Sequence, residues 1–140
     1  MHRYETATPQ PEIRITKRDL DRLDILIGYS SRNLSMRVVD FLVDELMRAQ
    51  IIDTESVPPT TVVMNSRVEY RDEESGARRE VTLVYPEDKH KHADGVSIMT
   101  LVGAALLGLS EGHSISYLGA DERPRVIKVL RVWPPRAGRA

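Results

Sequence analysis

The spacing of the hydrophobic residues changes at the pair Pro58-Pro59, and this change divides the chain into two parts. Before the proline pair, apolar residues recur at the spacing of one face of an α-helix. After it, they alternate with polar residues, as in strands that bury one face. One chain of 140 residues therefore has to combine a helical segment with a separate sheet. We expect an α+β fold, with an antiparallel or mixed sheet wrapped on one short helix.

Two helices are expected before the proline pair. Thr16 and Asp19 have the spacing of a capping box, and Gly28 is expected to end the first helix as a C′ residue. The second helix spans roughly 36–50. Its apolar stripe is Val39, Leu42, Val43, Leu46 and Met47. We expect an antiparallel hairpin in which each helix buries its stripe on the other; the alternative is that both helices simply cover a core.

The second part of the chain alternates in several short runs separated by turns. The expected strands are 62–70, 79–85, 96–98, 113–118 and 125–133. A charged loop is expected at 86–95. One short apolar helix, from Leu101 to Leu107, should begin at Thr100 and stop at Gly108.

These patterns predict five segments. We expect a flexible tail at 1–12, a helical hairpin or truncated coiled coil at 13–52, a linker at 53–60, a β domain at 61–133 and a second flexible tail at 134–140.

Charge and composition exclude several classes of protein. Lys and Arg number 20 against 21 acids, so the chain lacks the basic excess that a duplex-binding protein uses against phosphates. The absence of cysteine excludes disulfides and thiol catalysis. No apolar run approaches the length of a membrane span, and the first residues do not have the pattern of a signal peptide. We therefore expect a cytoplasmic protein whose main partner is neither a membrane nor a nucleic acid.

Three segments of the second part resemble one protein family. They are Val63-Met64-Asn65-Ser66-Arg67-Val68, then Thr82-Leu83-Val84-Tyr85-Pro86, then Val102-Gly103-Ala104-Ala105-Leu106-Leu107-Gly108-Leu109 followed by Gly112. The last segment resembles the G-x-A-L-L-G segment of the Gre transcript-cleavage factors. Together the three resemble most closely the Rnk type (regulators of nucleoside diphosphate kinase) of the GreA/GreB superfamily. The resemblance runs in order through residues 13–133.

The resemblance implies a fold and a partner. Gre-type proteins have an FKBP-like C-terminal domain that docks on the rim of the RNA polymerase secondary channel, and a coiled coil that points toward the catalytic metal. Rnk-type proteins keep the docking domain with a shorter coiled coil. They are named for an effect on nucleoside diphosphate kinase. The expected partner is therefore core RNA polymerase, bound by a monomer that is not an enzyme and has no cofactor.

The tip of the hairpin argues against transcript cleavage. A cleavage factor brings carboxylates that help to hold a metal ion beside the polymerase active site. Each helix here is only ~18 to 22 Å long by the helical rise. The tip, Gly28 to Ser35, contains no Asp or Glu, and Arg32 is its only charge. We expect binding without cleavage, with Tyr29, Arg32 and Asn33 as candidate channel contacts.

A second set of candidate contacts begins the short apolar helix. In Gre proteins a Ser-Pro pair usually begins this helix, near the polymerase contact, and Thr100-Leu101 stands in its place here. Thr can replace Ser as an N-cap, but the rigid φ of proline is lost. By resemblance, the candidate polymerase-binding residues are Met99, Thr100, Leu101 and Gly103.

Other charged groups have simpler explanations. His90 and His92, flanked by Asp88 and Asp94, have chelating spacing, but a solvated loop is the preferred interpretation. The charges of the second helix are Arg37, Asp40, Asp44, Glu45 and Arg48. They are interpreted as an exposed ion-paired face, or alternatively as contacts to basic channel walls. The basic end, 123–140, is interpreted as a strand and tail, or alternatively as a contact to an acidic surface or RNA.

Two other functions remain open. An FKBP-like fold could act as a prolyl isomerase, which needs an apolar pocket lined with aromatic rings. The candidate rings are Tyr70, Tyr85, Tyr117 and Trp133. The same domain surface could also serve as an interaction module for another partner.

Overall fold

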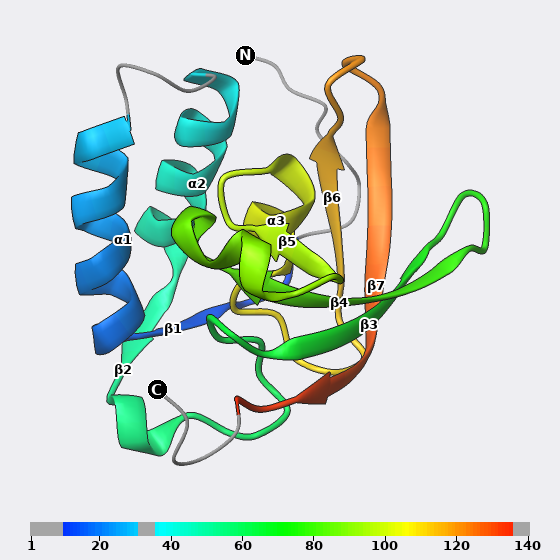
Figure 1. Cartoon of the computed structure of the whole chain (residues 1–140). Coiled ribbons are helices and arrows are strands. Elements are labelled where there is room, and N and C mark those ends of the chain that lie inside the picture. Colours follow the sequence, from blue (N-terminus) through cyan, green and yellow to red (C-terminus); the bar gives the residue numbers. More distant parts are fainter. Residues whose placement is uncertain (1–9, 31–35, 136–140) are drawn as a thin grey trace.

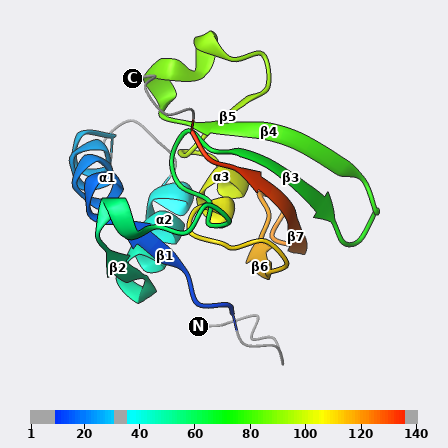
Figure 2. The ribbon, with the colours of Figure 1, turned by 90° about the horizontal axis from the view of Figure 1, so that it is seen from below.

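The structure, a computed structural model, describes residues 10–30 and 36–135. Helices α1 (Lys17–Ser30) and α2 (Met36–Arg48) precede a curled sheet, as Figure 1 shows. The sheet consists of β3 (Arg67–Asp72), β4 (Arg78–Val84), β5 (Gly95–Ser97), β6 (Ser114–Leu118) and β7 (Pro124–Trp133). Helix α3 (Leu101–Leu106) lies within the curl of the sheet (Figure 2). The predicted α+β fold is confirmed.

The sheet is mixed. Its strand order is β5-β4-β3-β7-β6. β5 runs parallel to β4, whereas β3 is antiparallel to both β4 and β7, and β6 is antiparallel to β7. The alternation that predicted the strands also places their inward side chains in one core. That core includes Val68, Tyr70, Val81, Leu83, Ile115, Tyr117, Ile127 and Val129.

The chain before β3 is not the strand that its alternation predicted. Residues 61–66 run beside the segment after α3, where the Val62 amide donates to the Leu109 carbonyl at 2.8 Å. The predicted linker contains a short 3₁₀ helix, η1 (Thr54–Ser56), and the predicted charged loop contains a second, η2 (Pro86–Lys91).

Gly108 ends the α3 region, as predicted. Its φ is +84°, in the left-handed region that glycine enters without steric cost. The backbone also passes close by, because a Cβ on Gly108 would lie 2.9 Å from the Cβ of Ile13. Glycine is therefore required here both for the turn and for the approach of the N-terminal segment.

Two short strands that were not predicted from the sequence close the base of the helical hairpin. β1 (Arg14–Thr16) pairs in parallel with β2 (Gln50–Ile52). Each strand has three residues, which is too short for alternation to stand out. This pair fixes the start of α1 beside the chain that leaves α2.

The two helices differ from the prediction in how they pack. α1 continues through Gly28 to Ser30, so Gly28 does not end it. α2 packs against α3, and its residue Leu42 and the α1 residue Leu23 are fully buried in the shared core. The helices therefore cover the core of the β domain, which is the alternative that the sequence left open.

For two residues of α2, the solvent exposure predicted from the sequence is wrong. Met47, expected in the buried stripe, is 80% exposed. Glu45, expected on the exposed face, is only 5% exposed. Its carboxylate accepts two hydrogen bonds from the Arg48 guanidinium, at 3.0 and 2.8 Å, and this pairing allows a charged group to be buried.

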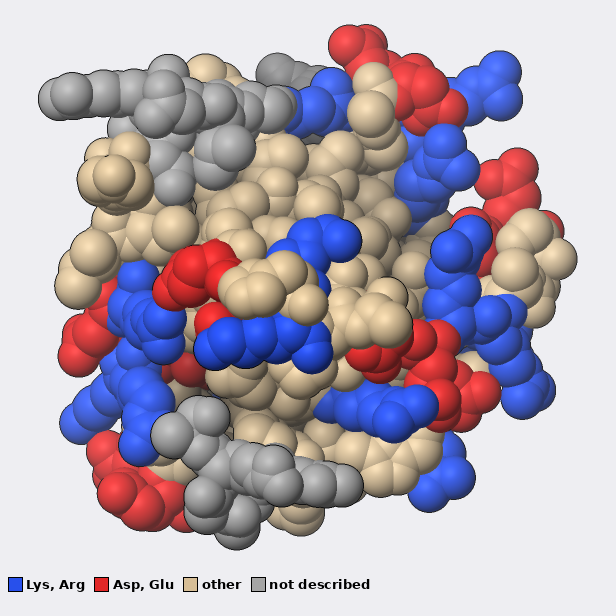
Figure 3. Space-filling view, in the orientation of Figure 1, with Lys and Arg blue, Asp and Glu red and all other residues tan. Residues whose placement is uncertain are grey.

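The surface carries charges of both signs. On the described part of the face in Figure 3, Lys and Arg lie among Asp and Glu, and no continuous area of one sign stands out. Many of these charges are paired, as in Lys17–Asp53 at 3.1 Å and Arg125–Asp121 at 2.9 Å. Among the helices within residues 10–30 and 36–135, none is long and apolar enough to cross a membrane.

Candidate functional site

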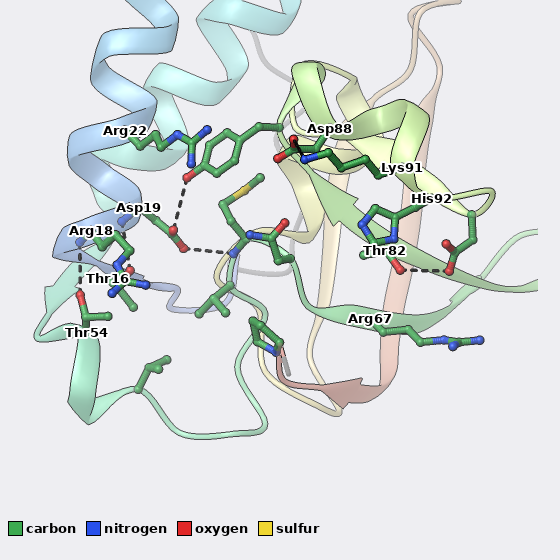
Figure 4. A pocket seen from close by; sticks show the side chains of 17 residues that line it. Thr16, Arg18, Asp19, Arg22, Thr54, Arg67, Thr82, Asp88, Lys91 and His92 are labelled. Carbon is green, nitrogen blue, oxygen red and sulfur yellow. Dashed lines mark hydrogen bonds and ion pairs between the residues drawn. The ribbon is translucent and has the colours of Figure 1, made fainter. Parts of the chain in front are cut away.

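A groove of about 1000 Å³ lies where the first turns of α1 meet the β domain (Figure 4). Arg18 and Arg22 of α1 stand on one wall, and Lys91 and His92 stand on the other. The remaining lining residues are Thr16, Asp19, Thr54, Val57, Val63, Met64, Asn65, Arg67, Thr82, Tyr85, Asp88, Asp94 and Pro135. The groove is thus lined by both apolar and charged side chains.

Asp19 holds α1 against the β domain. The Thr16 hydroxyl accepts a hydrogen bond from the Asp19 amide at 3.2 Å, which confirms the predicted cap and places the carboxylate in the first turn of the helix. That carboxylate accepts from the Met64 amide at 3.0 Å and from the Tyr85 hydroxyl at 3.3 Å. Burial raises the pKa of the Asp19 carboxyl, and these hydrogen bonds partly oppose the shift.

Arg22, one turn further along α1, makes a second link. Its guanidinium lies 4.1 Å from the centre of the Tyr85 ring and also 2.6 Å from the Glu87 carboxylate. Burial, together with the neighbouring Asp19 charge, raises the pKa of the Tyr85 hydroxyl, which therefore stays protonated as a donor. The helical hairpin thus contacts two of the segments that carry the family resemblance, one at Met64 and the other at Tyr85.

The candidate contacts at the start of α3 are partly exposed. Thr100 is the N-cap: its hydroxyl accepts from the Gly103 amide at 3.1 Å and donates to the Ser97 carbonyl at 2.7 Å. Thr100 is exposed, whereas Met99 and Leu101 are half-buried. Gly103 is buried, and a Cβ there would collide with the carbonyl oxygen of Ser97. Gly103 therefore serves packing, and a partner would meet the residues before it.

The candidate contacts at the hairpin tip are only partly described. Tyr29 is 81% exposed, while Arg32 and Asn33 lie outside the described residues. Two further apolar side chains, which the sequence analysis did not select, are exposed near this end: Ile25 at 74% and Met36 at 55%. Their helical spacing was visible in the sequence, but their outward direction depends on how the hairpin packs.

Arg37 joins the hairpin to the far end of the sheet. Its guanidinium donates to the Gly119 carbonyl in the β6–β7 turn at 2.8 Å and lies 3.9 Å from the Glu122 carboxylate. The predicted ion-paired face of α2 therefore reaches across to the sheet at this residue, instead of pairing only along the helix.

Of the two histidines considered for a metal site, His92 lines the groove. His90 is within η2 and His92 follows its last residue. The Asp94 carboxylate accepts from the Thr82 hydroxyl at 3.0 Å, and Asp88 pairs with Lys91 at 3.2 Å. Across the described parts of the chain, no three His, Asp or Glu residues come together in a way that could hold a metal ion.

Two family models match the chain in succession. The model described as "Rnk N-terminus" matches residues 11–52. The model described as "Transcription elongation factor, GreA/GreB, C-term" matches residues 57–134, more than half of the chain.

Known proteins also match the chain. The regulator of nucleoside diphosphate kinase of Escherichia coli (strain K12) is 41% identical over 108 residues, which are 77% of this chain and 79% of that protein. Transcription elongation factor GreA of Desulfovibrio desulfuricans is 26% identical over 78 residues, or 56% of this chain and 48% of that protein. A solved structure of a prokaryotic transcription elongation factor GreA/GreB from Nitrosomonas europaea has a TM-score of 0.66 and 38% identity, and the match covers 89% of this chain and 99% of that one.

The fold and the sequence matches agree. The helical pair corresponds to the Rnk N-terminus, and the curled sheet around α3 corresponds to the GreA/GreB C-terminal domain. The chain belongs to the GreA/GreB transcription elongation factor family, as a regulator of the Rnk type.

Proposed function

We propose that this protein binds core RNA polymerase at the rim of the secondary channel and competes there with Gre factors, without stimulating transcript cleavage. By family resemblance, its regulatory output includes the level of nucleoside diphosphate kinase. The protein acts as a cytoplasmic monomer without a cofactor. Contact with DNA or RNA is at most indirect.

The observation that carries the proposal is a retained domain beside a shortened hairpin. The GreA/GreB C-terminal match spans residues 57–134. In contrast, α1 has 14 residues and α2 has 13, so the helices are only about 21 and 20 Å long at 1.5 Å per residue. In the view of Figure 1, neither helix extends past the turn between β6 and β7. Such a hairpin is too short to carry a group deep into a channel.

The chemistry of the hairpin supports the same conclusion. Stimulated cleavage requires carboxylates that help to bind a metal ion at the polymerase active site. The tip sequence from Gly28 to Ser35 contains no acid. The buried acid of α1, Asp19, is engaged by Met64 and Tyr85 at the opposite end of the helix. Neither the tip nor Asp19 is therefore placed to bring a carboxylate to the polymerase active site.

The proposed polymerase contacts are the residues that begin α3 and the exposed end of the hairpin. Met99, Thr100 and Leu101 form the first set; Tyr29 is the described member of the second, to which Arg32 and Asn33 also belong. An exposed tyrosine is a common anchor at protein interfaces because it combines a large apolar surface with a hydroxyl group. Gly103 contributes indirectly, by allowing α3 to pack against Ser97.

Binding to purified core polymerase tests the proposal. We expect Met99→Ala and Tyr29→Ala each to weaken binding about tenfold, which corresponds to about 1.4 kcal/mol. Met47→Ala is the matched control, because Met47 is 80% exposed but lies in the last turn of α2, at the other end of that helix from the tip. Failure of the wild-type protein to bind core polymerase at micromolar concentration would refute the proposal and would favour an interaction module for another partner.

Prolyl isomerase activity has little support from the aromatic side chains. Tyr70, Tyr85 and Tyr117 are all buried. Tyr85 does line the groove, but its hydroxyl donates to Asp19 and its ring is covered by the Arg22 guanidinium. The relatives reported above are named as regulators and transcription factors. A prolyl-peptide assay would contradict this argument if it detected turnover.

A further inference from the structure

Arg37 lies at a helix position that does not favour a positive charge. It is the second residue of α2, and the first turn of that helix contains no acid. The N-terminal end of a helix dipole is positive, so a cation there is repelled. Contacts outside the helix offset this repulsion, because the Arg37 guanidinium reaches the turn between β6 and β7.

The turn that receives Arg37 is held by its own hydrogen bonds. The Gly119 amide donates to the Arg123 carbonyl, and the Glu122 amide donates to the Gly119 carbonyl, each at 2.9 Å. The Asp121 carboxylate accepts from the Arg123 amide at 3.1 Å. The Gly119 carbonyl has a second lone pair, and the Arg37 guanidinium donates to it at 2.8 Å. A group bound to this turn is therefore bound to the sheet.

Arg37 makes this link at the end of α2 that is nearest the hairpin tip. The start of α2 and the turn between β6 and β7 lie toward the same end of the molecule in Figure 1. Further along the helix, Val39 is buried and the ring of Phe41 stacks on Tyr117 of β6, with 6.0 Å between the ring centres. Among the described residues that precede Val39 in α2, Arg37 is the one that makes a hydrogen bond or ion pair with the β domain. The tip, whose sequence ends at Ser35, is attached to this first turn.

We propose that Arg37 is a positioning residue. By binding the turn between β6 and β7, it fixes the direction in which the hairpin presents its tip relative to the β domain. The inference rests on the proposed function, in which polymerase meets both the tip and the start of α3. Two sets of contacts on one rigid body bind a partner with less loss of conformational freedom than two sets that move independently. Arg37 thus strengthens the binding made through Tyr29 and does not itself touch polymerase.

Variants of Arg37 test its effect on binding to core polymerase. Arg37→Met keeps an unbranched apolar stem without the guanidinium, and it should weaken binding about threefold to fivefold. Arg37→Lys can still donate to the Gly119 carbonyl and should recover most of this loss. Lys17→Met is the matched control, because it removes an exposed cation, paired with Asp53 at 3.1 Å, from the first turn of α1 at the other end of the hairpin. It should bind as the wild type does.

A double-mutant cycle separates positioning from direct contact. In the Tyr29→Ala background, Arg37→Met should have almost no further effect on binding, because the side chain that it positions is already lost. In the Met99→Ala background, most of the effect of Arg37→Met should remain, because the tip is intact. Equal losses with and without Tyr29 would show that Arg37 acts by its own contact or by a general loss of stability, and would overturn the proposal.

A measurement on the free protein keeps this proposal distinguishable from the proposed function. The chain contains no cysteine, so spin labels can be attached specifically at Ile25→Cys and His113→Cys, which are both exposed positions. Double electron–electron resonance should show a broader distance distribution between the two labels in Arg37→Met than in the parent protein, and no change in Lys17→Met. If circular dichroism shows that Arg37→Met is unfolded, Arg37→Gln takes its place.

The two measurements together decide the role of Arg37. An unchanged distance distribution in Arg37→Met would overturn the proposal, whatever the binding result. If the wild-type protein does not bind polymerase, the proposed function fails, and the spin-label result alone still decides whether Arg37 fixes the hairpin.

Discussion

The carboxylate of Asp19 links the helical hairpin to the β domain through two hydrogen bonds, and its removal gives a quantitative prediction. Asp19→Ala deprives two donors, the Met64 amide and the Tyr85 hydroxyl, of their acceptor. Met64 and Tyr85 are 3% exposed each, so neither donor can turn to bulk water. A buried unsatisfied donor costs about 1 to 3 kcal/mol. The two donors together would cost about 2 to 6 kcal/mol, but the variant no longer has to bury a carboxylate, which offsets part of this cost. We therefore expect the free energy of unfolding to fall by about 3 kcal/mol.

Urea unfolding measures this loss as a change in the midpoint at a constant slope. Asp24→Ala removes an exposed acid from the same helix and should change the free energy of unfolding by no more than about 0.5 kcal/mol. In a double-mutant cycle with Tyr85→Phe, we expect a coupling energy of about 1 kcal/mol. If Asp19→Ala costs no more than Asp24→Ala, or if the cycle shows no coupling, then Asp19 does not hold the hairpin as described.

Three further predictions concern pH and the start of α3. Because the pKa of Asp19 is raised above 3.8 in the folded protein, the proton-linked part of the stability from its carboxyl is fully present below that pH and is lost as the pH rises through the folded pKa. The stability advantage of the wild type over Asp19→Asn should therefore shrink toward neutral pH; an advantage that grows would contradict this assignment. Gly103→Ala should cost more than about 3 kcal/mol, since its Cβ would collide with backbone, whereas Gly112→Ala, at a positive φ in open space, should cost about 1 kcal/mol. Thr100→Ala should cost about 1 kcal/mol through the lost N-cap, and Thr100→Ser should recover most of it; thermal melts check both glycine and threonine variants.

The sequence predicted the elements whose pattern is local. The helical stripe and the alternating runs correctly placed α2, β4, β6 and β7 within a few residues. The capping interaction between Thr16 and Asp19 was also predictable, because it joins residues only three positions apart. Local spacing is sufficient for features of this kind.

The remaining features depend on contacts between distant residues. The partners of Asp19 lie 45 and 66 positions further along the chain, and no periodicity connects them. The spacing of the charges on α2 predicted that Glu45 lies on an exposed face, but in the fold Glu45 is buried, and it pairs with Arg48 at 2.8 Å. The hydrogen bonds between Gln10 and Ser116 of β6 span 106 positions and assign a structural role to a residue that was expected to be in a flexible tail. In each case the tertiary arrangement determines the environment, and a pattern within one segment does not report it.

The segments that carry the family resemblance include residues of the candidate site, although the resemblance did not predict their contacts. Two of the matching segments contain Met64 and Tyr85, which receive α1, and the third forms α3. These segments therefore form part of the contact between the hairpin and the domain as well as part of the core. The exposure of Ile25 and Met36 was not predicted from the sequence, and the structure identified it.

The most direct test of the proposed function is transcript cleavage by backtracked elongation complexes in the presence of a Gre factor. We predict that this protein alone produces no shortening of the transcript, and that an excess of it suppresses Gre-stimulated cleavage in proportion to its binding to core polymerase. Transcript shortening by this protein alone, or undiminished Gre-stimulated cleavage at saturating concentration, would contradict the account of a docking domain that carries a shortened hairpin without acids at its tip.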